Sequence, residues 1–168
     1  MDQNTYLKTV YDKLRRDGFE LSNDKIHEFD VVVAKKFKFT KQMNIFAIMG
    51  DANNISKDVI ENFSKISLDY TLKVLDYLEV KLFVPLVGET RTRIMEAAVG
   101  SFALLVSSNI DEDAKQWVQQ RPKKHFAAFE IPVIFDLKKN EIYHYKKTPI
   151  WGAIHYRFFR NFIKKYFK

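Results

Sequence analysis

The chain has no cysteine and only five glycines among its 168 residues. The absence of cysteine excludes a disulfide framework, a thiolate nucleophile and a thiolate metal site, and it is compatible with a reducing compartment. The five glycines form neither a Gly-x-Gly-x-x-Gly nor a Gly-x-x-x-x-Gly-Lys pattern. Nucleotide binding through a loop of either kind is therefore disfavoured. A Gly-x-Ser-x-Gly nucleophile elbow is also missing.

Long hydrophobic runs are missing too. The most apolar window, AAVGSFALLV at residues 97–106, is far shorter than the roughly 18 residues that a membrane-spanning helix requires. The N-terminus, MDQNTYLKTVYDKL, lacks the basic start and apolar run of a signal peptide. Since 46% of residues are hydrophobic and 29% charged, we expect a folded, soluble, cytoplasmic protein without a transmembrane segment.

Acidic residues are scarce in the C-terminal third. Residues 114–168 contain 13 Lys or Arg and three acids, a balance of +10, whereas residues 1–113 have a balance of −3. This asymmetry predicts a basic face for nucleic acid or another polyanion. An equally open interpretation is that the positive charge is incidental, on a structural or protein-interaction module. The candidate nucleic-acid-binding residues are Lys123, Lys124, Arg157, Arg160, Lys164 and Lys165.

Hydrophobic periodicity predicts one α/β domain over residues 1–168, with a mixed sheet that is partly parallel. Residues 125–168 are expected to form a hairpin, turning at 138–140, and a basic aromatic C-terminal helix. The other expected helices are 4–18, 55–74, 91–100 and 109–122, and the other expected strands are 18–22, 27–40, 42–50, 79–88 and 101–108. The expected N-caps are Asn4 or Thr5, Ser56, and Ser108 or Asn109.

The expected order of elements suggests a family. A helix, a short strand, two longer strands, a helix and another strand form the core order of the PD-(D/E)XK, or restriction-endonuclease-like, nucleases. In EFDVVVA, Asp30 stands at the head of a hydrophobic strand, where that family places a metal-binding aspartate. The stretch AAVGSFALLVSSNIDEDAKQWVQQ also resembles a segment of Mrr-like members. The resemblance covers roughly residues 5–135 and implies a nucleic-acid substrate and a divalent metal cofactor.

The sequence departs from that family at the second motif. The family carries an acidic residue and a lysine two positions apart on the next strand, because the carboxylate shares the metal and the lysine stabilises developing charge. Here that strand reads QMNIFAIMG, without either residue. A displaced catalytic set of Asp30, Glu79 and Lys81 is the remaining candidate, and the Asp136-x-Lys138 pair is a second place to test. We predict no robust metal-dependent nuclease activity and no required cofactor.

The final helix divides into two faces. One arc is aromatic and apolar, and the other carries the cations, which is the pattern of an amphipathic helix. Packing on the sheet is the favoured role, and peripheral association with a membrane surface is the alternative. The apolar arc contains Phe158, Phe159, Phe162, Ile163, Tyr166 and Phe167.

A zinc site is disfavoured because no two of the four histidines share one helical face.

Overall fold

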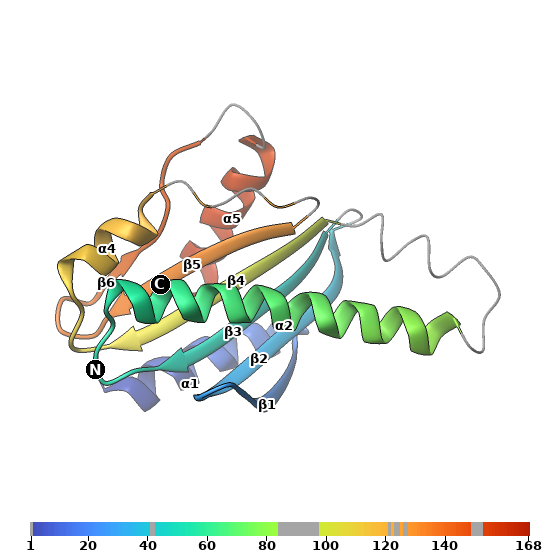
Figure 1. Ribbon diagram of the computed structural model, residues 1–168, viewed down its shortest axis with the longest axis horizontal. Coiled ribbons are helices and arrows are strands. Elements are labelled where there is room, and N and C mark those ends of the chain that lie inside the picture. Colours follow the sequence, from blue (N-terminus) through green and yellow to red (C-terminus); the bar gives the residue numbers. More distant parts are fainter. Residues whose placement is uncertain are drawn as a thin grey trace.

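The structure is a computed structural model that describes residues 2–40, 43–83, 98–120, 122, 125, 128–148 and 153–168. These residues form one α/β domain with a six-stranded sheet in the order β1-β2-β3-β4-β5-β6 (Figure 1). This architecture confirms the predicted fold class. Along the chain the elements are α1 (Gln3–Arg16), β1 (Glu20–Ile26), β2 (Phe29–Thr40), β3 (Met43–Asp51), α2 (Lys57–Phe83), β4 (Ala98–Ser107), α4 (Glu112–Val118), β5 (Ala128–Asp136), β6 (Glu141–Tyr143) and α5 (Ala153–Tyr166).

The sheet is mixed, as predicted. Strands β1, β2 and β3 form an antiparallel meander, β3, β4 and β5 are parallel, and β6 returns antiparallel to β5. The central strands are near-continuous apolar runs because helices cover both of their faces. Strand β4, for example, is buried at every position after Ala98. The predicted pairing of β2 with β3 is confirmed, with Thr40 opposite Met43, while residues 41–42 of the turn lie outside the described residues. The predicted turn at residues 138–140 is confirmed.

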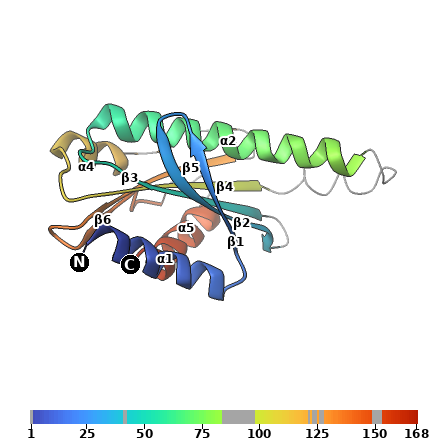
Figure 2. The same cartoon turned by 90° about the horizontal axis from the view of Figure 1, so that it is seen from below.

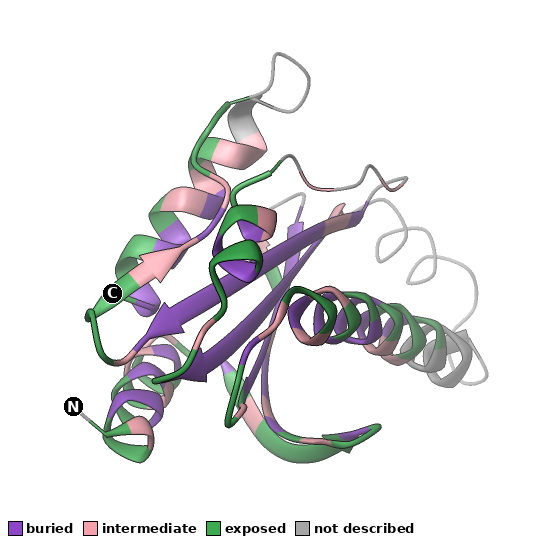
Figure 3. Ribbon diagram, turned by 60° about the vertical axis from the view of Figure 1, so that its left-hand side comes forward, coloured by how far each residue is buried: buried purple, intermediate pink, exposed green. Residues whose placement is uncertain are grey.

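Two layers of helices enclose the sheet. Helices α1 and α5 cover one face, and α2 and α4 cover the other (Figure 2). Alternate residues of β3 serve the two layers, since Ile45 belongs to the α1/α5 core and Phe46 to the α2/α4 core. Figure 3 shows the buried strands between helices whose outward faces are exposed. Within the described parts of the chain, no helix combines the length and apolarity needed to cross a membrane.

Helix α2 is longer than predicted, and the strand expected at residues 79–88 is wrong where the structure describes it. The helix extends to Phe83, so residues 79–83, expected as part of a strand, are helical. The physical reason is that no proline or glycine occurs between Ser56 and Pro85, and Leu, Glu and Lys are good helix formers.

The helix end predicted at Gly100 is also wrong. Residues 98–100 begin β4 instead of ending a helix, and the rest of that expected helix lies outside the described residues. A Cβ atom on Gly100 would lie 3.0 Å from Cδ1 of Ile45 and 3.3 Å from Cε1 of Phe159. The glycine therefore allows close packing inside the core. Because glycine often follows the last residue of a helix, Gly100 was interpreted as a helix end.

One of the three predicted N-caps is confirmed, and the other two are wrong. Ser56 caps α2, because its Oγ accepts a hydrogen bond from Val59 N at 3.3 Å. Helix α1 is instead capped by Asp2, whose Oδ1 accepts from Thr5 N at 2.9 Å. Helix α4 begins after Asp111, so the caps expected at Ser108 or Asn109 are wrong.

Candidate nucleic-acid interface

A groove of about 560 Å³ lies between β6 with its following segment and helix α5. Its apolar wall includes Phe135, Ile142 and Ile163. Five basic side chains also line it: His144, Lys146, Arg160, Lys164 and Lys168.

The amphipathic pattern of α5 explains how cations come to line this groove. The predicted packing of α5 on the sheet is confirmed, because Phe159, Phe162 and Phe167 are at most 3% exposed. Phe162 stacks on Phe102 of β4 with ring centroids 4.2 Å apart. With this arc fixed against the sheet, Arg160 and Lys164, four residues apart, lie one turn from each other on the groove side of the helix.

The groove keeps most of its positive charge unneutralised. Within the described residues, Lys146, Arg160, Lys164 and Lys168 have no ion pair with a carboxylate. The guanidinium of Arg160 donates from Nη1 to the carbonyl oxygen of Lys147 at 3.2 Å, which orients it while leaving its charge uncompensated. One acid, Glu141, lines the groove, and it accepts a hydrogen bond from Tyr143 Oη at 2.6 Å.

Among the basic side chains that line the groove, His144 is the least exposed, at 8%. Burial lowers the pKa of its imidazole below the usual value of 6.5, and the nearby Lys146 and Arg160 lower it further. Its Nδ1 lies 3.0 Å from the carbonyl oxygen of Tyr145. Because a carbonyl only accepts, Nδ1 carries the proton of the neutral ring. The positive charge of the groove at neutral pH therefore comes from the lysines and Arg160.

The predicted cations separate into distinct groups. Arg160 and Lys164 line the groove, and Arg157 is exposed three residues before Arg160. Lys165 is solvent-exposed, at 61%, but its ammonium group pairs with Asp17 and it is not among the residues that line the groove. Lys123 and Lys124 lie outside the described residues.

Sequence reasoning missed Lys146, Lys168 and His144 as groove residues. Lys168 could have been found, since it follows Arg160 and Lys164 at intervals of four along α5 and its end. Lys146 and His144 could not, because only the folded hairpin brings them beside the helix.

The predicted catalytic residues are separated in space. Asp30 lies at the start of β2, beside the pairing of Val31 with Gly50 near the carboxyl end of β3. Its side chain is 87% exposed, with Oδ1 3.9 Å from Nζ of Lys25. It lines an open pocket of about 490 Å³ against α1.

Glu79 and Lys81 lie in the last turns of α2, on the opposite face of the sheet from α1. The helix starts close to the carboxyl end of β3 and runs back along the sheet (Figure 1). The β1–β2 hairpin contacts α2 at Asn62 and at Tyr70, whose Oη donates to Asp24 at 2.6 Å. Glu79 is nine residues beyond Tyr70, a further rise of about 14 Å. The helix therefore carries these residues away from Asp30. Among the described residues, no three His, Asp or Glu side chains form a group that could hold a metal ion.

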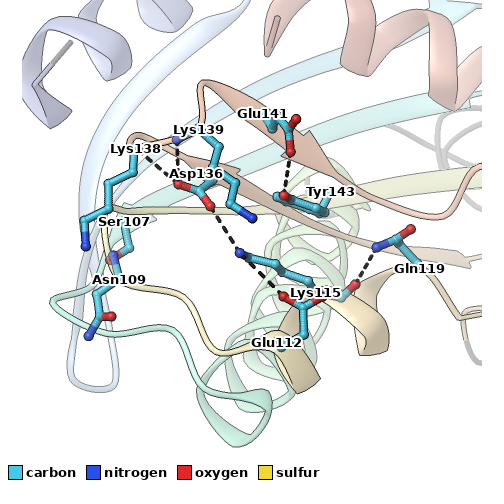
Figure 4. A network of polar contacts seen from close by, with 10 residues as sticks. All are labelled: Ser107, Asn109, Glu112, Lys115, Gln119, Asp136, Lys138, Lys139, Glu141 and Tyr143. Carbon is cyan, nitrogen blue, oxygen red and sulfur yellow. Dashed lines mark hydrogen bonds and ion pairs between the residues drawn. The ribbon is translucent and has the colours of Figure 1, made fainter.

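The carboxyl ends of the parallel strands are a common ligand site in open α/β sheets, but here their polar groups pair internally (Figure 4). Asp136, at the end of β5, forms a buried ion pair with Lys115 of α4, with Oδ2 3.3 Å from Nζ. Its Oδ1 accepts from Lys138 N at 3.0 Å and Lys139 N at 3.1 Å. Asp136 therefore holds the hairpin turn and α4 together.

Ser107, at the end of β4, is similarly engaged. Its Oγ donates to the carbonyl oxygen of Asn53 at 3.2 Å and accepts from Asn109 N at 3.0 Å. The groove between β6 and α5 is therefore the stronger candidate for a binding site, and its assignment depends on its own geometry and charge.

Comparison of this chain with protein-family models, curated proteins and solved structures finds no match in any of the three.

Proposed function

We propose that this protein binds nucleic acid through its phosphate backbone, with little sequence preference, in the groove between β6 and α5. The observation that carries the proposal is the convergence of Lys146, Arg160, Lys164 and Lys168 on one groove without a carboxylate partner in the described chain. Cations placed against phosphates release condensed counterions, which drives binding regardless of sequence. A cysteine-free chain suits the cytoplasm, where we place this activity.

The length of the basic row supports a backbone contact. From Arg157 to Lys164 the helix rises by about 10 Å, close to three successive steps along the axis of a B-form duplex at about 3.4 Å each. Micromolar or weaker affinity is expected, because a few phosphate contacts are typical of non-specific binding.

Two features bear on the nuclease resemblance. The order α1-β1-β2-β3-α2-β4 is the order on which that resemblance depends, and this supports a nucleic-acid ligand. The separation of Asp30 from Glu79 and Lys81 supports binding without cleavage. Binding of an acidic protein surface by the same cations is the alternative function.

A charge-reversal experiment tests the proposal. The double variant Lys146→Glu, Lys164→Glu changes two exposed groove cations, and Lys57→Glu, Lys73→Glu makes the same change in net charge on α2, across the sheet. Fluorescence anisotropy with labelled DNA and RNA should show binding lost in the groove variant and kept in the α2 variant. Equal losses in both would contradict a defined site.

A further inference from the structure

Two tyrosines lie close along the chain to residues that line the basic groove, although neither is itself part of its lining. Tyr145 lies between His144 and Lys146, both of which line the groove, and Tyr156 lies one helical turn before Arg160. Their rings are in contact, with centroids 5.5 Å apart and planes at 72°. Both side chains are half-buried, so each keeps part of its surface in solvent.

The two rings are held differently. Tyr156 also contacts Phe159, with centroids 5.7 Å apart, and Phe129, at 6.2 Å, so the core fixes its position. Tyr145 projects from the segment after β6 and contacts the ring of Tyr156. A fixed tyrosine thus supports a second one, which directly precedes the groove residue Lys146 in the chain.

We propose that the ligand of this groove is single-stranded nucleic acid, with a base stacked on Tyr145 and the flanking phosphates on Lys146, Arg160 and Lys164. This inference rests on the proposed function and names its substrate class. A single strand exposes the faces of its bases to aromatic side chains, whereas the bases of a duplex are stacked on each other and cannot reach them. The groove, at about 560 Å³, has the size of pockets that enclose small ligands.

The test compares three labelled ligands of equal length. One is an oligothymidylate of about 12 nucleotides, within the site sizes of single-strand binders. The second is the same strand with abasic residues, which keeps the phosphates and removes the bases, and the third is a duplex. Wild type should bind the oligothymidylate more tightly than the abasic strand by about 5- to 150-fold, the effect of one base–aromatic stack.

Two variants of Tyr145 locate the effect. Tyr145→Leu keeps apolar bulk but removes the ring, and its affinity for the oligothymidylate should fall to the abasic level. Its affinity for the abasic strand and the duplex should stay unchanged. Tyr145→Phe keeps the ring and should bind like wild type.

The outcomes separate this inference from the proposed function. If wild type binds the oligothymidylate and the abasic strand equally, or Tyr145→Leu changes nothing, while the Lys146→Glu, Lys164→Glu variant still abolishes binding, then base stacking is wrong and backbone binding stands. If wild type binds none of the three ligands, both are wrong.

Discussion

The ammonium nitrogen of Lys165 lies 2.5 Å from a carboxylate oxygen of Asp17 at the end of α1. The same carboxylate accepts a hydrogen bond from Tyr166 Oη at 2.6 Å. Together with Tyr6 Oη, which donates to the carbonyl oxygen of Phe167 at 2.7 Å, these contacts join the first helix to the last. Lys165 therefore holds α5 on the domain, while the cations on the groove side of α5 keep their charges available.

The Asp17 contact predicts a specific dependence of stability on acid pH. Lys165, and then Tyr166, lower the pKa of Asp17 below its usual 3.8. A carboxyl with a lowered pKa in the folded state contributes stability that is complete above its unfolded pKa and is lost as pH falls through its folded pKa. Thermal melting should show wild type losing more stability below about pH 4 than Asp17→Asn does. Equal acid sensitivity of Asp17→Asn and wild type would contradict the assignment.

The buried pair of Lys115 and Asp136 predicts an asymmetric response to mutation. Their side chains are 7% and 5% exposed, so Asp136→Ala leaves an ammonium group buried without its nearest counterion. We expect a loss of about 3–5 kcal/mol in the free energy of unfolding, measured with urea. The double variant Lys115→Met, Asp136→Ala should recover part of it, and Lys138→Ala should lie within about 0.5 kcal/mol of wild type. An Asp136→Ala variant with the same free energy of unfolding as wild type would show that the ion pair is dispensable.

The aromatic face of α5 decides between core packing and membrane association. Phe159, Phe162, Ile163, Tyr166 and Phe167 are nearly fully buried, at about 1.5–3 kcal/mol each. Their sum is comparable to the whole net stability of a domain, about 5–15 kcal/mol.

Deletion of residues 154–168 should therefore unfold or aggregate the protein, as circular dichroism and size-exclusion chromatography would show. A folded, monodisperse truncation that had lost only its binding to anionic liposomes would instead support the membrane alternative.

Cleavage assays test the catalytic hypothesis. Because Asp30 is exposed and the region of Glu79 and Lys81 lies at the far end of α2, we expect no robust cleavage of single-stranded or duplex DNA or RNA with magnesium or manganese. Asp30→Ala should change the free energy of unfolding by no more than about 1 kcal/mol. Cleavage that disappears in both Asp30→Ala and Lys81→Ala would contradict this prediction and establish a displaced nuclease site.

The local pattern of the sequence was sufficient for most of the fold. The β-branched run at Val31–Val33 and the apolar run of β4 predict strands, and the aromatic arc of α5 predicts a packed helix, because each records burial along its own element. The role of Gly100 was missed because it depends on Ile45 and Phe159 across the core. The extension of α2 was missed although the local sequence before Pro85 allows a helix, because the short apolar stretch at residues 79–88 also fits a strand.

The groove could be predicted only in part for the same reason. Arg160 and Lys164 follow from the pattern of one helix. The ion pair of Lys165 with Asp17 and the position of Lys146 in the groove do not, since each brings together distant parts of the chain.

The salt dependence of binding tests the central claim most directly. If Lys146, Arg160, Lys164 and Lys168 each neutralise one phosphate of a single strand, the logarithm of the association constant should fall against the logarithm of salt concentration with a slope of about −3. In the variant Lys146→Gln, Lys164→Gln the slope should become shallower by about 1.4. A slope near zero for wild type, or an unchanged slope in the variant, would contradict binding of the phosphate backbone by this groove.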